Sequence, residues 1–71
     1  MISLTERQLE VLTALSFGLT YAEAARELGI GLETVKYHAD NLRKKFEVRT
    51  STEAVALGFR QGILSRDFGD E

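Results

Sequence analysis

The sequence predicts an all-α domain, and three observations support that fold class. A threonine followed three residues later by Gln or Glu, the capping box that begins many helices, occurs at Thr5, Thr20 and Thr50. Apolar residues recur every three to four positions across residues 32–46, as they do on one face of a helix. No stretch alternates between β-branched and polar residues for long enough to predict a strand. We therefore expect a bundle of four helices.

The first helix is expected near residues 5–17. Leu4 and Leu9 flank a cap at Thr5 in the positions of a hydrophobic staple, which sets the angle at which the chain enters a helix. Gly18 follows the helical run, where a left-handed residue commonly ends a helix.

The remaining helices are expected near residues 21–28, 32–46 and 51–61. Gly29 and Gly62 follow two of them as stop signals. The third helix has no capping box, and its start is inferred from its apolar stripe, which consists of Leu32, Val35, Ala39, Leu42 and Phe46.

Only residues 29–31 separate the second and third helices, which is the spacing of a helix-turn-helix over about residues 21–40. Such a turn needs a small residue where the helices cross, a glycine for a positive φ, and an apolar residue in the angle. Ala25, Gly29 and Val35 meet these needs. The pattern favours DNA binding, although a purely structural helical hairpin would use the same residues.

The composition excludes several classes of protein. The chain has 71 residues and no cysteine, so it has room for one domain and cannot form a disulfide or a zinc-thiolate site. Neither a membrane-spanning run nor a signal peptide is evident, and we expect a cytoplasmic protein without a membrane partner. We assign residues 1–64 to the domain and residues 65–71 to a flexible acidic tail.

The net charge of −2 conceals an uneven distribution. Between residues 36 and 49 the chain carries five basic residues against two acidic ones. The basic residues are Lys36, Arg43, Lys44, Lys45 and Arg49. This concentration is expected if one element meets an anionic partner, although a solvated, lysine-rich helix face would give the same pattern.

Several motifs occur together in order along the chain. They are Leu4-Thr5-Glu6-Arg7-Gln8, Gly18-Leu19-Thr20, Leu28-Gly29-Ile30, Thr34-Val35-Lys36 and Thr52-Glu53-Ala54-Val55. In this respect residues 4 to about 64 resemble the LuxR/FixJ-type (GerE-like) helix-turn-helix domain of bacterial transcription regulators. The resemblance implies sequence-specific binding of double-stranded DNA, with the third helix in the major groove and the fourth forming a dimer contact. The promoter-binding C-terminal region of sigma factors shares the early motif, but the fourth helix and the segment 34–38 favour the LuxR type.

The outward face of the third helix supplies most candidate DNA contacts, because Val35 directs the opposite face toward the core. Lys36, Tyr37 and Asn41 are candidates for reading base edges, and the resemblance adds Asp40. Thr34 lies at the N-terminal edge of this face. Three residues are candidates for phosphate contacts, although simple solvation would also explain the lysines: Thr20, Lys44 and Lys45.

Asp40 is unusual on a face that meets phosphates. It can accept a hydrogen bond from a cytosine amino group, or it can pair with Lys36 and Lys44, each four residues away. We favour the intrahelical pairs in the free protein. With few basic groups available, a single domain should bind DNA weakly.

The fourth helix provides the candidate dimer interface, which consists of Val55, Gly58, Phe59 and Gly62. Small residues allow two helices to approach closely, and a two-fold contact would place two recognition helices about 34 Å apart on a palindromic site. The alternative is a helix packed entirely within its own chain.

No catalytic residue, metal ligand, cofactor or small-molecule ligand is expected. His38 is the only histidine. Its ring is expected to lie partly beneath the third helix and to have a structural role. A rival hypothesis is that the fold serves as a protein-interaction module for a partner such as RNA polymerase. The sequence leaves open the operator, activation or repression, the controlling signal, and whether the chain is part of a larger regulator.

Three positions depart from the resemblance. Gly31 stands where the family usually has Ser or Thr as the cap of the third helix, and glycine caps slightly less well. Ala24 replaces a larger aliphatic residue. Glu47 replaces a common glycine, which would cost about 1 kcal/mol if the position has a positive φ.

Overall fold

The computed structural model describes residues 2–65, which form four helices and, within that range, no strand. The helices are α1 (Glu6–Ser16), α2 (Tyr21–Leu28), α3 (Leu32–Phe46) and α4 (Ser51–Arg60). Each end lies within one residue of the position predicted from the sequence. The predicted acidic tail falls, from residue 66 onward, outside the described residues.

Local capping interactions explain why the helix starts were predictable. At Thr5, Thr20 and Thr50 the threonine oxygen accepts the N3 backbone amide, and the N3 side chain accepts the threonine amide in return. Gly31 caps α3 with no side-chain hydrogen bond, as expected for glycine. Glu47 does have a left-handed backbone, with φ 58°, so a strain of about 1 kcal/mol falls on this non-glycine residue.

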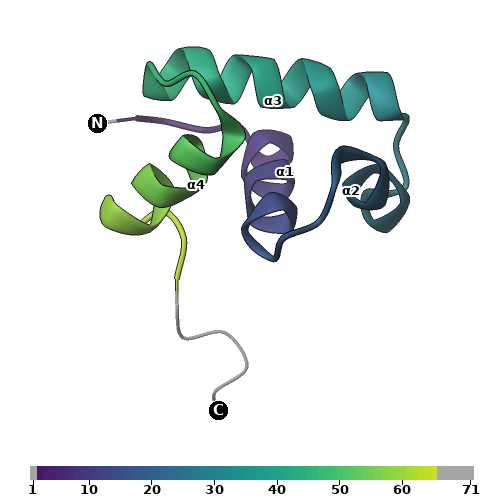
Figure 1. The fold of residues 1–71 in the computed structure, drawn as a ribbon, viewed down its shortest axis with the longest axis horizontal. Coiled ribbons are helices and arrows are strands. Elements are labelled where there is room, and N and C mark those ends of the chain that lie inside the picture. The colour runs from purple at the N-terminus through teal and green to yellow at the C-terminus, as the bar shows by residue number, and fades with distance from the viewer. Residues whose placement is uncertain (1, 66–71) are drawn as a thin grey trace.

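The helices are arranged around two central elements (Figure 1). α1 and α3 each pack against all three other helices, whereas α2 and α4 lie on opposite sides of α1. The largest fully buried side chains belong to these two helices, and they are Val11, Leu12, Val35 and Leu42. The core therefore holds α3 by one face along its length and leaves its other face in solvent.

Ala24 is fully buried, so α2 packs against the core despite the small side chain. None of the helices in the described part of the chain is long and apolar enough to cross a membrane.

Candidate nucleic-acid interface

The turn between α2 and α3 fixes the start of the recognition helix. Gly29 adopts a left-handed conformation with φ 70°, and the amide of Ile30 donates to the carbonyl of Ala25 at 3.0 Å. Ala25 and Val35 are both buried where the two helices meet. The turn thus uses its small, flexible and apolar residues as the sequence predicted.

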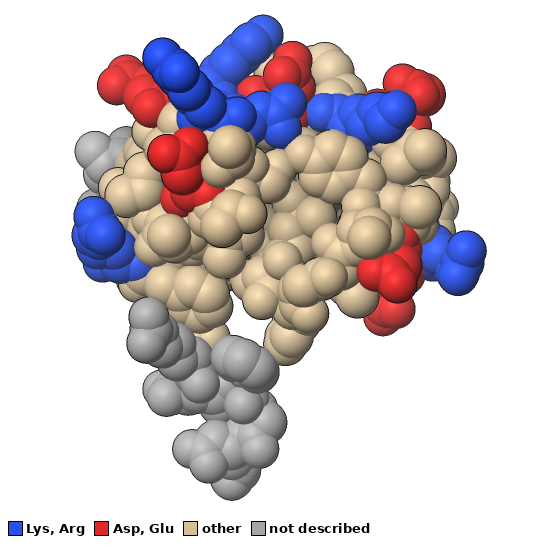
Figure 2. Space-filling view, in the orientation of Figure 1, with Lys and Arg blue, Asp and Glu red and all other residues tan. Residues whose placement is uncertain are grey.

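The outward face of α3 combines basic, aromatic and acidic groups. The side chains of Lys36, Asp40 and Lys44 are 52%, 55% and 74% exposed, and Tyr37 is 64% exposed as a whole residue. Figure 2 shows Lys and Arg side chains following α3 along one edge of the molecule, with acidic side chains among them. A surface depression of about 410 Å³ lies on this face, bordered by Lys36, Tyr37 and Asp40.

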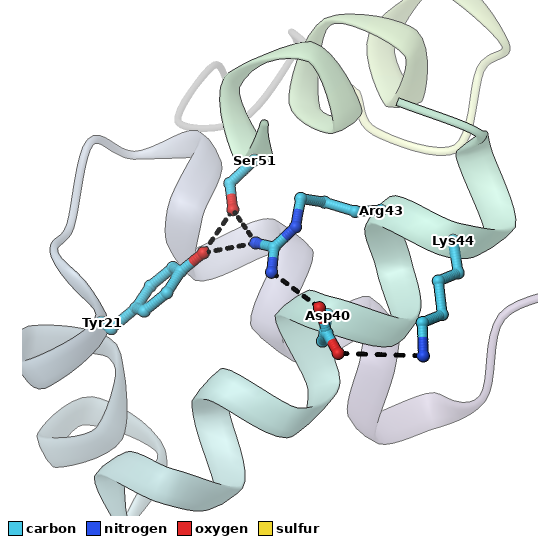
Figure 3. Close-up of polar contacts among 5 residues, drawn as sticks. All are labelled: Tyr21, Asp40, Arg43, Lys44 and Ser51. Atoms are coloured by element: carbon cyan, nitrogen blue, oxygen red, sulfur yellow. Dashed lines mark hydrogen bonds and ion pairs between the residues drawn. The ribbon is translucent and has the colours of Figure 1, made fainter. Parts of the chain in front are cut away.

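Arg43 connects this face to two other helices (Figure 3). Its Nη1 donates to the Tyr21 hydroxyl at 2.9 Å and to Ser51 Oγ at 3.4 Å, and those two hydroxyls lie 2.6 Å apart. Its Nη2 donates to Asp40 Oδ1 at 2.9 Å. Tyr21 and Ser51 are the first residues of α2 and α4, so one guanidinium joins the starts of two helices to the last turn of α3.

The environment of Arg43 also keeps it charged. Partial burial acts to lower its pKa, but the hydrogen bonds to Tyr21 and Asp40 outweigh that effect and raise the pKa. Arginine is protonated at neutral pH in any case, so the guanidinium is a cation at the junction of the three helices.

Asp40 is paired within α3, but with one partner that the sequence analysis did not predict. Its Oδ2 lies 3.8 Å from Lys44 Nζ, as expected, whereas its second partner is Arg43. The predicted pair with Lys36 is wrong, because Lys36 Nζ instead lies 3.6 Å from Glu33 Oε2. Arg43 is already held by Tyr21, so it meets Asp40 with less loss of side-chain freedom than a mobile lysine.

The other candidate DNA contacts occupy different environments. Thr20 and Thr34 are exposed, with the Thr20 hydroxyl capping α2, and Asn41 is half-buried. Lys45 is held away from the others: its Nζ donates to the carbonyl of Ser3 at 2.7 Å and to Gln8 Oε1 at 2.8 Å. Its ammonium fastens the N-terminal segment and α1 to α3, which gives it a structural partner of its own.

His38 of α3 is half-buried. Its ring meets the ring of Tyr37 edge-on, with the ring centroids 5.5 Å apart. Its Nδ1 is buried and has no hydrogen-bond partner within residues 2–65. Its position agrees with the packing role expected from the sequence.

With this geometry established, comparison with known proteins identifies the family. The sequence profile of the luxR family of bacterial regulatory proteins, GerE, matches residues 2–57. The chain belongs to this family. The match favours the LuxR-type interpretation over the sigma-factor alternative.

Relatives within the family are named as regulators. The chain is 41% identical over 63 residues to the transcriptional regulatory protein LnrK of Bacillus subtilis, covering 89% of this chain and 29% of LnrK. It is 43% identical over 61 residues to the transcriptional activator RamA of Corynebacterium glutamicum, covering 86% of this chain and 22% of RamA. The chain thus spans less than a third of the length of these curated relatives.

A solved structure has the same fold. The Vibrio cholera VqmA–ligand–DNA complex superimposes with a TM-score of 0.80 at 32% identity, covering 87% of this chain and 27% of VqmA. That structure contains DNA, as its description states.

The candidate dimer residues on α4 of this luxR-family chain do not share one environment. Gly58 is buried, and a Cβ atom there would lie 2.9 Å from Leu64 Cδ1 and 3.2 Å from Leu12 Cδ2. The absence of a side chain at Gly58 therefore lets α4 pack closely against Leu12 and Leu64 of its own chain. Val55 and Phe59 are half-buried against the core, and Gly62 is exposed with φ 77°.

Sequence reasoning missed Tyr21, Arg43 and Ser51 as a group that positions the recognition helix. The sequence marks Arg43 only as one of the basic residues between 36 and 49, and Ser51 only as part of the fourth helix. The three are separated by 8 to 30 positions in the chain, and no local pattern links them.

Proposed function

We propose that this domain binds double-stranded DNA in a sequence-specific manner through α3, and that it regulates transcription as a homodimer through α4. The observation that supports DNA binding is the exposed face of α3, where basic and aromatic side chains stand on a helix held by its opposite face. Membership of a family whose members are regulators supports the transcriptional role. The domain has no catalytic role in this proposal, and a bacterial DNA regulator acts in the cytoplasm.

The residues of α3 divide into two roles. Lys36, Tyr37 and Asn41 read base edges in the major groove: the ammonium suits guanine acceptors and the amide suits adenine. Lys44 and the start of α2 at Thr20 contact phosphates, which set the position of the domain but not its sequence preference. Thr34 lies at the N-terminal edge of this surface.

The DNA proposal is tested with a site selected by the domain itself. Duplexes enriched from a random pool are titrated at low salt with the wild type, Lys36→Ala and Lys45→Ala. We expect Lys36→Ala to lose about 1–3 kcal/mol of specific binding, because a direct base contact is removed. Lys45→Ala is the matched control, since its ammonium is occupied by Ser3 and Gln8. If no sequence is enriched, the DNA proposal fails and the protein-interaction hypothesis takes its place.

Dimerisation through α4 rests on Phe59 and Val55, which keep part of their apolar surface in solvent. Sedimentation of the wild type, Phe59→Glu and the exposed control Gln61→Glu tests it. We expect association for the wild type and the control but not for Phe59→Glu. A wild type that stays monomeric at high concentration, both free and on a palindromic duplex, would remove this interface.

A further inference from the structure

An apolar groove between α1 and α2 has no part in the proposed DNA contact. It encloses about 530 Å³ and is lined mainly by apolar side chains, among them Leu9, Phe17, Leu19 and Leu28. Leu9 and Phe17 are 39% and 56% exposed, although both are large and apolar. These exposed apolar side chains gather in one groove and are not scattered singly over the surface.

The pattern of α1 explains why this groove exists. Leu9, Thr13 and the C-cap residue Phe17 follow one another at intervals of four, so they lie along one side of α1, which borders the groove. Val11 and Leu12 lie on another face and are fully buried in the core. α1 thus has two apolar sides. The side with Val11 and Leu12 is covered by the bundle, and the side with Leu9 and Phe17 is left partly exposed.

The charged residues of the groove are both acidic. Glu10 and Glu27 are part of its lining, and no Lys or Arg is. Arg7 Nη1 lies 3.1 Å from Glu10 Oε1 and partly neutralises the charge of that carboxylate. Glu27 forms no ion pair within residues 2–65. A negative rim repels the phosphates of nucleic acids and of acidic lipids and attracts Lys or Arg side chains.

The groove and the outward face of α3 are lined by different residues. α1 ends on the side of the bundle away from α3 (Figure 1), and Phe17 and Leu19 directly follow that end. A partner seated there would not compete with DNA for the outward face of α3.

We propose that this groove is a docking site for a basic amphipathic helix of a protein partner. The apolar side chains of that helix would enter between Leu9, Phe17 and Leu28, and its Lys or Arg side chains would lie beside Glu27 and Glu10. A second copy of this chain is a poorer occupant, because its basic residues gather on and just after α3. The proposal goes beyond DNA binding and does not depend on it.

Two synthetic peptides test the site. Each is a helix of about 16 residues with leucines at positions i, i+3, i+4 and i+7, and its remaining positions are filled by Lys in one peptide and by Glu in the other. They are titrated into ¹⁵N-labelled domain and followed by amide chemical shifts. We expect the Lys peptide to bind more tightly and to shift amides at Leu9, Phe17 and Leu19, while those of α3 change little.

Variants of the groove separate charge from apolar contact. Glu27→Lys should lower the affinity of the domain for the Lys peptide by about threefold to fivefold and raise its affinity for the Glu peptide, as expected for a surface charge pair. Phe17→Ser should lower the affinity for both peptides by about tenfold, because the apolar surface that this side chain buries on binding is lost. Glu33→Lys is the matched control, since that exposed carboxylate lies on α3 outside the groove and should leave both affinities unchanged.

Several results would overturn the proposal. They are equal affinity for the two peptides, shifts confined to α3, no binding of the Lys peptide at millimolar concentration, or self-association of the domain that Phe17→Ser abolishes. Circular dichroism checks that each variant is folded. If Phe17→Ser does not fold, the opposite responses of the two peptides to the surface change Glu27→Lys still decide the question. DNA binding that is unchanged in Phe17→Ser would show that the two surfaces act separately.

Discussion

Arg43 contributes to this fold chiefly through what it touches beyond its own helix. Its guanidinium meets two hydroxyls, from α2 and α4, on one side and the Asp40 carboxylate on the other. A planar group with five donors satisfies such a set of acceptors, which a lysine ammonium would not do with the same geometry. Arg43 therefore adds a polar link between α3 and the starts of α2 and α4 to the apolar packing that already holds the helix.

Replacing Tyr21 by Phe tests this contact. The change removes the hydroxyl that Arg43 and Ser51 share and keeps the ring. Because a hydrogen bond to a charged group is lost, we expect the free energy of unfolding to fall by about 1–2 kcal/mol. Urea unfolding measures it. Tyr37→Phe is the control, since the Tyr37 hydroxyl has no hydrogen-bond partner in the described part of the chain and its loss should change stability little.

At the scale of a helix, the start of α4 is sensitive to acid. Glu53 accepts hydrogen bonds from the backbone amides of Arg49 and Thr50, and these lower its pKa from the ordinary value of 4.5. A lowered pKa in the folded state means that the stabilisation is complete above pH 4.5 and is lost as the pH falls through the lower folded value.

Glu53→Gln should make the stability of the domain less dependent on pH in that range. Glutamine keeps an acceptor for the capping box, as Gln8 does at the start of α1, but it does not titrate. Unfolding by urea at a series of pH values from neutral to about 3 measures the effect. Glu33→Gln, which removes a carboxyl without backbone hydrogen bonds, is the control. Identical slopes for Glu53→Gln and the wild type would contradict this account.

Gly58 brings α4 close to α1. An alanine Cβ would come within 2.9 Å of Leu64 Cδ1 and 3.2 Å of Leu12 Cδ2, so these packed leucine side chains would have to shift. We expect Gly58→Ala to lower the free energy of unfolding by about 1–2 kcal/mol, even though alanine favours the helix.

A second change separates the intramolecular and dimer roles of Gly58. If the crowding is internal, the effects of Gly58→Ala and Leu64→Ala should be less than additive, because the smaller residue removes the nearest contact. The loss should also be the same at every protein concentration. A loss that appears only at concentrations where the protein associates would instead assign Gly58 to the dimer.

At the scale of the whole molecule, the net charge of −2 limits the electrostatic contribution to DNA binding. Each phosphate neutralised contributes a slope of about −0.9 in a plot of log K against log salt. Lys44→Ala should reduce the magnitude of that slope by about one, whereas Lys45→Ala should leave it unchanged and lower stability instead. Titrations at several salt concentrations compare the two variants. Equal changes in slope would show that Lys45 leaves its partners to contact phosphate.

The helices and the turn were predictable from the sequence because the interactions that define them are local. Each capping box joins residues three positions apart, and the turn depends on Gly29 and on the residues beside it in the chain. The apolar stripe of α3 likewise determines which face is outward, since side-chain direction follows from helical period alone. These features also carry the family resemblance, which the match over residues 2–57 confirms.

The tertiary structure decided which partner each polar side chain takes. Tyr21 and Ser51 are 30 positions apart, and Lys45 and Ser3 are 42 apart, so no local pattern connects them. Asp40 has basic residues on both sides along α3, and the anchoring of Arg43 by another helix selects between them. The sequence by itself therefore determined the helices, the turn and the exposed face of α3. Only packing decided which partners Arg43, Asp40 and Lys45 take, because it brings distant residues within hydrogen-bond distance.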